Sequence, residues 1–93
     1  MKIYYFFQEH DWCRQLIAKD NEGKVVSYAS EQATQWSLYG AKLKLYRYKD
    51  WDLVNSMLEK VIHKNYNMDL LEFNESPKIT KEDVMKVCLE AGV

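Results

Sequence analysis

Apolar and polar positions alternate at helical spacing over much of the second half of the chain. Between residues 50 and 65, apolar side chains recur three or four positions apart, which is typical of a helix with one buried face. Asp50 stands at the start of this segment and can cap the helix. The apolar face comprises Trp51, Val54, Leu58, Val61 and Ile62.

The C-terminal segment carries the strongest local helix signal. Thr80 and Asp83 have the spacing of a capping box, and Ile79 and Val84 have that of a hydrophobic staple. Gly92 follows the last apolar position, as glycine often does after a helix. The sequence therefore predicts a helix between these two ends. Its buried stripe comprises Val84, Val87, Cys88 and Ala91.

A third helix is predicted to start at Ser30, a candidate N-cap, and it is apolar on two sides. One stripe comprises Leu38, Ala41, Leu45 and Tyr48, and the other comprises Ala33, Trp36, Gly40 and Leu43. Gly40 costs about 1 kcal/mol relative to alanine inside a helix, so it indicates that something packs closely there. A partner protein or the rest of the chain could supply the second cover. We favour the chain itself, through Trp12 and Leu16.

The remaining segments have extended or ambiguous patterns. Residues 12–19 and 24–28 predict two strands, joined by a turn over residues 20–23. Residues 2–9 contain a continuous apolar run, and periodicity alone cannot tell a buried strand from a buried helix there. Residues 70–73 form a short apolar segment that we expect to be extended.

Together these elements predict the fold class. With 93 residues, the chain is expected to form a single domain with one modest core. We predict an α+β fold in which one β-hairpin packs on three main helices, with a short N-terminal helix left open as an addition. The expected core comprises Trp12, Leu16, Trp36, Leu38, Ala41, Leu45, Trp51, Val54, Leu58, Ile62, Phe73, Val84, Val87 and Cys88.

Charge and cysteine content narrow the setting. The formal net charge is −1, so no global field recruits nucleic acid or an anionic membrane. No stretch approaches the ~20 apolar residues of a membrane span, and the N-terminal run lacks the marks of a signal peptide. Cys13 and Cys88 are too few for a disulfide framework and are typical of reduced thiols. We therefore expect a soluble cytoplasmic protein with no membrane partner.

Aromatic and basic residues interleave after Leu38, and they supply the candidate binding residues. These are Tyr39, Lys42, Tyr46, Arg47 and Lys49. In a continuous helix, all of them except Arg47 fall on one face. Such a face is consistent with a protein-binding surface, a surface that stacks bases and pairs phosphates, or a solvated face on which lysine stems cover tyrosine rings. Asp50 and Asp52 close by weaken the nucleic-acid interpretation.

Other chemistry-bearing residues are sparse. His10, Cys13, His63 and Cys88 could ligate zinc by type, but only the first two have a ligand-like spacing, so we expect no metal site. The motifs of a nucleophile elbow, a P-loop, a zinc protease and a dinucleotide site are absent, so we expect no cofactor and no enzymatic activity. Asn74 could bind a ligand, but an amide in a turn more often bonds nearby backbone.

Several residues in order also resemble a known family. They are Trp12, Ala18-Lys19-Asp20 with Gly23, Ala33-x-x-Trp36 with Gly40-Ala41, Phe73-Asn74, and Thr80-x-x-Asp83-Val84. This order resembles a family of small uncharacterised bacterial and bacteriophage proteins, known only as a domain of unknown function. The resemblance implies a leading helix, which favours a helix over residues 2–9, and a bacterial or phage setting. It implies no activity, and Ser37 and Glu75 stand where the family pattern has Cys and Asp.

The sequence thus favours a small non-enzymatic protein that works by binding another protein, either a host protein or a second copy of itself. In a phage setting it would modulate or inhibit a host system in the host cytoplasm. The alternative is a protein that binds and sequesters a nucleotide or another small molecule, which needs a pocket beside Tyr39, Lys42, Tyr46 and Arg47. A third hypothesis is binding of single-stranded nucleic acid.

Overall fold

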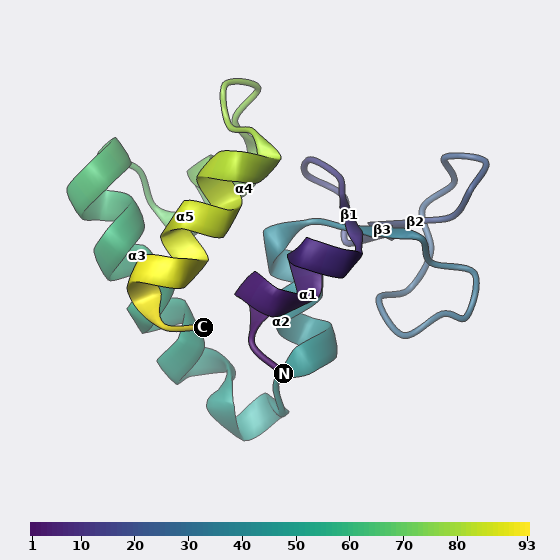
Figure 1. Cartoon of the computed structure of the whole chain (residues 1–93), viewed down its shortest axis with the longest axis horizontal. Coiled ribbons are helices and arrows are strands. Elements are labelled where there is room, and N and C mark those ends of the chain that lie inside the picture. The colour runs from purple at the N-terminus through teal and green to yellow at the C-terminus, as the bar shows by residue number, and fades with distance from the viewer.

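The computed structural model describes all 93 residues, Met1 to Val93. Five α-helices lie beside a small three-stranded sheet (Figure 1). The helices are α1 (Ile3–Glu9), α2 (Leu38–Leu45), α3 (Trp51–Tyr66), α4 (Leu70–Glu75) and α5 (Lys81–Ala91), with a 3-10 turn, η1 (Tyr48–Asp50), before α3. The strands are β1 (Asp11–Trp12), β2 (Ala18–Lys19) and β3 (Gln35–Trp36). The predicted α+β class is confirmed.

Helix α1 joins the two halves of the molecule. Figure 1 shows α3, α4 and α5 on one side and the sheet with its loops on the other. Helix α1 packs against both α5 and α2, and the backbone N–H of Tyr4 donates to the carbonyl of Val93 over 3.2 Å. The N-terminal apolar run is therefore a helix, as the resemblance favoured. Ile3, Phe6 and Phe7 recur at helical spacing in α1, and all three side chains are buried.

The sheet has the strand order β1-β3-β2. Strand β1 runs parallel to β3, with Trp12 opposite Trp36. Strand β2 runs antiparallel to β3, with Ala18 opposite the same residue. The central strand is thus contributed by a segment that the sequence pattern placed in a helix.

The long first strand predicted over residues 12–19 is wrong. Gln15 has a φ of 75°, in the left-handed region, and this conformation interrupts an extended strand. Only residues 18–19 remain as β2, and the predicted partner over residues 24–28 keeps a single bridge, between Lys19 and Val25. The hairpin therefore exists in a reduced form, completed by β3.

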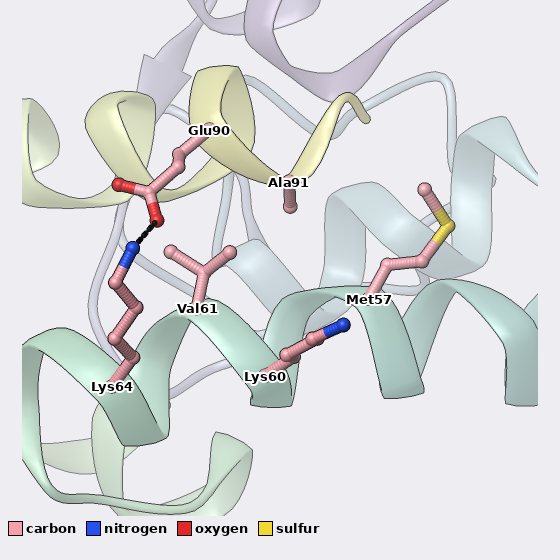
Figure 2. A pocket seen from close by; sticks show the side chains of 6 residues that line it. All are labelled: Met57, Lys60, Val61, Lys64, Glu90 and Ala91. Carbon is pink, nitrogen blue, oxygen red and sulfur yellow. Dashed lines mark hydrogen bonds and ion pairs between the residues drawn. The ribbon is translucent and has the colours of Figure 1, made fainter.

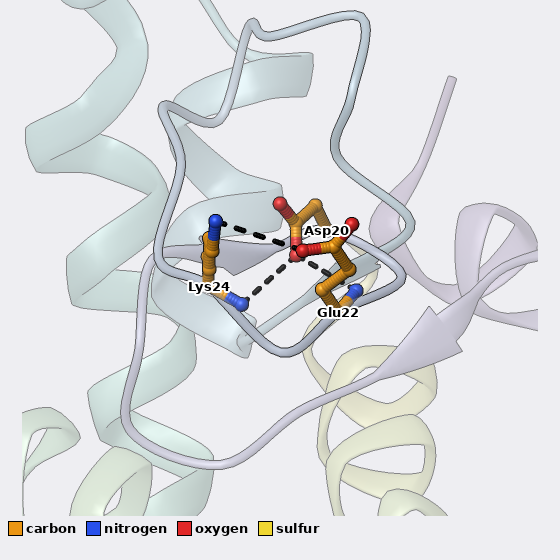
Figure 3. Close-up of polar contacts among 3 residues, drawn as sticks. All are labelled: Asp20, Glu22 and Lys24. Atoms are coloured by element: carbon orange, nitrogen blue, oxygen red, sulfur yellow. Dashed lines mark hydrogen bonds and ion pairs between the residues drawn. The ribbon is translucent and has the colours of Figure 1, made fainter.

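The turn predicted over residues 20–23 is confirmed (Figure 3). One carboxylate oxygen of Asp20 accepts hydrogen bonds from the backbone N–H groups of Glu22 and Lys24, each over 2.9 Å. Gly23 has a φ of 82°, which glycine adopts without a steric penalty. The side chain of Asp20, rather than strand pairing, therefore shapes this loop.

Helix α2 begins seven residues after the predicted start. Ser37, not Ser30, is the N-cap, and its Oγ accepts the N–H of Gly40 over 3.0 Å. The preceding residue belongs to β3, and its carbonyl accepts the N–H of Cys13 over 3.0 Å. Pairing with two distant strands thus overrides the helical pattern before Ser37. The two predicted stripes shrink accordingly, because Ala33 and Trp36 lie outside the helix.

The close contact predicted at Gly40 is confirmed, and the chain itself supplies it. A Cβ on Gly40 would overlap the carbonyl oxygen of Ile17 and lie 2.8 Å from its carbonyl carbon. Trp36 is only 5% exposed, and its ring lies edge-on to Phe6 with the centroids 5.0 Å apart. Neither residue is left for a partner, so internal cover was the right interpretation of this segment.

Residues 70–73 are helical, so the extended segment predicted there is wrong. Helix α4 begins with a capping box in which the carboxylate of Asp69 accepts the N–H of Glu72 over 2.8 Å. In a capping box the two residues satisfy each other's free N–H groups. The sequence signal for this helix is the spacing of Asp69 and Glu72 on either side of two leucines.

The helices predicted at residues 50–65 and 80–91 are confirmed as α3 and α5. In α5, Thr80 and Asp83 form the predicted capping box, and Gly92 ends the helix with a φ of 78°. Helix α3 ends at Asn67, which adopts the left-handed conformation. Asp50 precedes α3 as predicted, but its side chain makes no capping hydrogen bond, so only the apolar spacing supports that prediction.

The core is one cluster of 18 buried residues to which all five helices and the sheet contribute. Full burial of one large apolar side chain contributes about 1.5–3 kcal/mol, so the three residues of α1 are a substantial addition to the predicted core. Four residues expected in the core are only half-buried; these are Trp12, Leu16, Leu45 and Trp51.

Candidate functional site

The predicted tyrosine-and-lysine face is not continuous. Helix α2 ends at Leu45, and Tyr46 is its C-cap in an extended conformation. Lys49 lies in η1, beyond that break. The expectation that Tyr39, Lys42, Tyr46 and Lys49 share one helical face is therefore wrong, because the helix is too short to carry all of them.

Lys42 is buried, with 2% of its surface exposed. Its Nζ donates to Oδ1 of Asn55 on α3 over 2.9 Å, and it lies 4.2 Å from the ring centroid of Tyr39 and 5.6 Å from that of Trp51. Burial lowers the pKa of Lys42, and the charge of Asp52 opposes this shift. Lys42 thus joins α2 to α3 and is not part of an exposed surface.

The other basic candidates form an exposed corner between α2 and α3. Arg47 and Lys49 are exposed, and Tyr48 between them is 79% exposed, with its ring edge-on to Trp51. Tyr46 is half-buried; its carbonyl accepts the indole N–H of Trp51 over 2.8 Å, and burial raises the pKa of its hydroxyl. We call residues 47–49 the basic corner.

Tyr39, the remaining candidate, opens onto a cavity of about 250 Å³ that we call the α2–α4 groove. Helices α2, α3 and α4 and the loop at residues 13–17 all contribute to it. Its lining residues are Gln15, Tyr39, Glu59, Leu70, Leu71, Asn74 and Glu75. Leu70 is buried, whereas Tyr39 is 39% exposed and Leu71 is 65% exposed. The groove therefore has an apolar centre that solvent reaches.

Asn74 holds the groove together. Its Oδ1 accepts the N–H of Tyr39 over 3.2 Å, which gives the first turn of α2 a second cap beside Ser37. Its Nδ2 lies 3.5 Å from the carbonyl oxygen of Gln15, and its own carbonyl accepts the N–H of Gln15 over 3.1 Å. The amide therefore bonds backbone, as favoured, but backbone that is distant in the sequence rather than nearby.

The edge of the groove stores backbone strain at Gln15. A left-handed conformation at a residue other than glycine costs on the order of 1–3 kcal/mol and persists only where the surroundings enforce it. The neighbouring Arg14 supplies part of that constraint. Its Nε donates to the carbonyl of Ser76 over 2.9 Å, and its Nη2 donates to the carbonyl of Ile79 over 2.6 Å. The loop is thereby fixed to the connection between α4 and α5.

The charges of the groove all have one sign. Glu59 and Glu75 place two carboxylates on its rim, and no lysine, arginine or histidine lines it. Neither carboxylate takes part in either of the two ion pairs of the structure, and neither accepts a side-chain hydrogen bond. The groove thus combines three apolar or aromatic lining residues with two carboxylates that form no ion pair within the chain.

A second hollow region, which we call the α3–α5 seam, differs in this respect (Figure 2). It holds a cavity of about 300 Å³ lined in part by Met57 and Val61, where Lys64 pairs with Glu90 over 3.4 Å. Glu90 also accepts a hydrogen bond from Asn65 over 3.2 Å. These two hydrogen bonds lower the pKa of its carboxyl. The one carboxylate that lines this cavity is therefore bonded within the chain, whereas Lys60 beside it forms no ion pair.

A cavity of about 520 Å³ shares Glu90 with the first, and apart from Lys86 the polar side chains that line it are bonded within the chain. The hydroxyl of Tyr66 donates to Asp83 over 2.9 Å. Burial, together with this bond, raises the pKa of Tyr66 to about 12. Burial alone would raise the pKa of Asp83, but hydrogen bonds from Thr80 and Tyr66 outweigh it and lower the pKa.

The histidine and cysteine candidates are spread among structural contacts. His10 stacks on Phe6, and Nδ1 of His10 lies 3.0 Å from the carbonyl oxygen of the same residue. Cys13 and Cys88 are buried and unpaired. Burial raises the pKa of both thiols, to about 12 for Cys88, and Lys19 opposes the shift at Cys13. No group of three or more His, Cys, Asp or Glu side chains is placed to hold a metal ion.

Most residues of the groove were missed in the sequence. The capping box at Asp69 and Glu72 would have revealed α4, and a helix there would have placed Leu71 and Glu75 on one structural unit with Asn74. Nothing local in the sequence marks Gln15 or Glu59, because each reaches the groove through the tertiary fold.

Comparisons with known proteins identify no relative: no family model, no curated protein and no solved structure matches this chain. The resemblance to the small bacterial and bacteriophage family therefore stays a prediction. None of the five helices is both long enough and apolar enough to cross a membrane.

Proposed function

We propose that this chain is a non-enzymatic protein that works by binding another protein, and that the α2–α4 groove is its binding site. One observation carries the proposal. Leu71 and Tyr39 are exposed side chains with large apolar surface, and they line the same hollow as the buried Leu70. At the centres of protein interfaces, contact residues close over hollows of this kind and exclude water.

The size of the groove favours a protein side chain over a free small molecule. Sites for drug-sized ligands measure about 300–1,000 Å³, whereas this cavity measures about 250 Å³. A volume of this order suits one or two side chains of a partner that makes its other contacts around the rim.

The charge of the groove argues against a nucleotide, which is our alternative hypothesis. The phosphates of a nucleotide would approach Glu59 and Glu75 with no cation in the lining to offset the repulsion. Among the candidate binding residues, only the basic corner could contact single-stranded nucleic acid, and there Arg47 and Lys49 are followed by Asp50 and Asp52. Protein binding therefore remains the leading proposal.

The proposed setting follows from the cysteines and the resemblance. Two buried, unpaired thiols suit a reducing compartment, so we place the protein in the cytoplasm. The resemblance adds a bacterial or phage origin and, with it, modulation of a host system.

The proposal is tested by a pair of matched variants. Leu71→Asp places a charge in the groove, and Leu53→Asp places the same charge on α3 at a site of similar exposure, 62% against 65%. With tagged protein and lysate of the source organism, we expect Leu71→Asp to lower recovery of the retained partner by about tenfold or more. We expect Leu53→Asp to recover the partner as the unmodified chain does. Equal recovery by both variants would refute the groove as the site.

A further inference from the structure

We propose that the partner of the α2–α4 groove presents a lysine or arginine side chain flanked by apolar residues, with the cation held between Glu59 and Glu75. This inference rests on the proposed function and adds the chemistry of the partner to it. Its basis is charge complementarity with an apolar groove, which favours a basic and apolar segment over an acidic or uniformly polar one.

The two carboxylates are available to such a partner. Glu59 on α3 and Glu75 on α4 line the same cavity from different helices, and neither is neutralised by a cation of the chain. Lys42 is the nearest basic candidate on α2, and its Nζ is already engaged by Asn55. A cation brought by a partner would therefore be the first opposite charge to enter the groove.

The apolar centre fits the rest of a basic side chain. Lysine and arginine carry aliphatic stems that pack on apolar surface while the charged head keeps polar contacts. Tyr39 and Leu71 offer that surface. Apolar neighbours in the partner would cover the exposed part of Leu71. A partner segment that is both basic and apolar therefore complements the groove better than one that is only basic or only apolar.

The rigidity of the groove supports selective recognition. Asn74 binds α2 and the loop at residues 13–17 at the same time, and Arg14 fixes that loop to the connection after α4. The lining side chains are therefore presented by elements that are joined to each other before any partner arrives. Binding then costs less ordering than it would at a mobile surface.

The test uses three short fluorescent peptides of equal length, built from Leu and Lys, from Leu and Glu, and from Ser and Lys. Fluorescence anisotropy measures their affinity for the unmodified chain and for two charge variants. Glu59→Gln with Glu75→Gln neutralises the groove, and Glu22→Gln with Glu31→Gln makes the same change in net charge at exposed loop positions outside it.

We expect the Leu/Lys peptide to bind most tightly and to lose about tenfold in affinity with the groove variant only. Three results overturn the inference: the Leu/Glu or Ser/Lys peptide binds as well, both charge variants weaken binding equally, or no peptide binds. The Leu71→Asp comparison separates this failure from failure of the proposed function. If Leu71→Asp loses the partner while the groove charge variant retains it, the site stands and its preference for a cation is wrong.

A second copy of the chain is the other occupant to exclude, because the basic corner has the same chemistry as the proposed partner. Light scattering over a range of protein concentrations detects such self-association. If the chain self-associates and both Tyr48→Ser and the groove charge variant abolish that association, the basic corner of another copy occupies the groove. This result would overturn the assignment to a separate partner.

Discussion

The α2–α4 groove and the α3–α5 seam are both hollow, and the larger cavities belong to the seam. In the seam, the carboxylates are already bonded within the chain, because Glu90 pairs with Lys64 and Asp83 accepts the hydroxyl of Tyr66, whereas Lys60 and Lys86 form no ion pair. In the groove, two carboxylates face solvent beside exposed apolar side chains. The comparison teaches that the volume of a hollow says less about binding than whether the chain has already satisfied the groups that line it.

The two regions also differ in how they are built. The seam joins two regular helices whose apolar spacing is evident in the sequence, and α5 also has a capping box. The groove depends on a loop held in a strained conformation, on an amide that caps a distant helix, and on a glycine that lets the loop approach. Substitutions at those supports should therefore disturb the groove first, and they provide the following ways to test the comparison.

The largest effect is expected at Gly40. In Gly40→Ala, the new Cβ overlaps the carbonyl of Ile17, and backbone atoms on both sides must move. We expect a loss of about 3 kcal/mol in the free energy of unfolding, the upper part of the range for overpacking, although alanine favours the helix itself. Urea denaturation followed by circular dichroism measures it. Gly23→Ala is the comparison in which a positive φ is strained and nothing lies near the added Cβ, so the difference between the two variants isolates the effect of steric overlap.

The aliphatic stem of Lys42 should contribute more to the free energy of unfolding than its charge does. Lys42→Ala removes the aliphatic stem of a side chain that is only 2% exposed, and we expect a loss of about 2 kcal/mol in unfolding free energy. Lys42→Met keeps most of the volume and removes a buried ammonium, so we expect a change within about 1 kcal/mol. The same denaturation experiment compares the two variants. Equal losses would mean that the charge, through Asn55, is what holds α2 to α3.

Substitution of Asn74 should affect the groove and leave the seam unchanged, so it distinguishes the two regions most clearly. Asn74→Ala removes the second cap of α2 and the link to the loop, with an expected loss of about 1–2 kcal/mol. Hydrogen exchange should accelerate at the amides of Tyr39 and Gln15 and not along α5. Asn65→Ala removes an exposed bond of the seam and should leave both the stability and the exchange pattern unchanged.

The smallest effect concerns the pH dependence of the seam. The pKa of Asp83 is lowered in the folded chain, so its contribution to stability is present above its ordinary pKa of 3.8 and is lost as the pH falls through the lowered value. The pKa of Tyr66 is raised to about 12, so its contribution is present below its ordinary pKa of 10.0 and is lost as the pH rises toward 12.

Tyr66→Phe removes the hydrogen bond that both shifts share. We expect the variant to lose about 1 kcal/mol or less of unfolding free energy at neutral pH. Its unfolding free energy should fall less steeply in acid, and the fall in base that Tyr66 causes should be absent. Unfolding free energies measured across pH in urea check these slopes. Unchanged slopes in the variant would show that the shifts arise elsewhere.

The parts of the fold that the sequence predicted are those with local causes. Thr80 and Asp83 cap a helix from within its own first turn, and Asp20 shapes its turn within four residues. Trp36 could not be placed in the same way, because its strand exists only through pairing with Trp12 and Ala18. The helical spacing of the residues around it favoured the wrong element.

The candidate site was predicted in part for the same reason. Tyr39 was chosen for its residue type and does line the groove, whereas Lys42 was chosen by the same criterion and is buried. Helical phase alone could not show that α3 would cover one of them. Glu59 and Glu75 meet only because α3 and α4 pack together, which no spacing along the chain indicates.

The most direct test of the groove is a map of amide chemical shifts during titration of the nitrogen-15-labelled chain with the Leu/Lys peptide. The account predicts that the shifts gather at Gln15, Tyr39, Leu71 and Asn74, while the amides of Lys64 and Glu90 in the seam stay where they are. Shifts centred on the seam, or spread evenly over both regions, would contradict it.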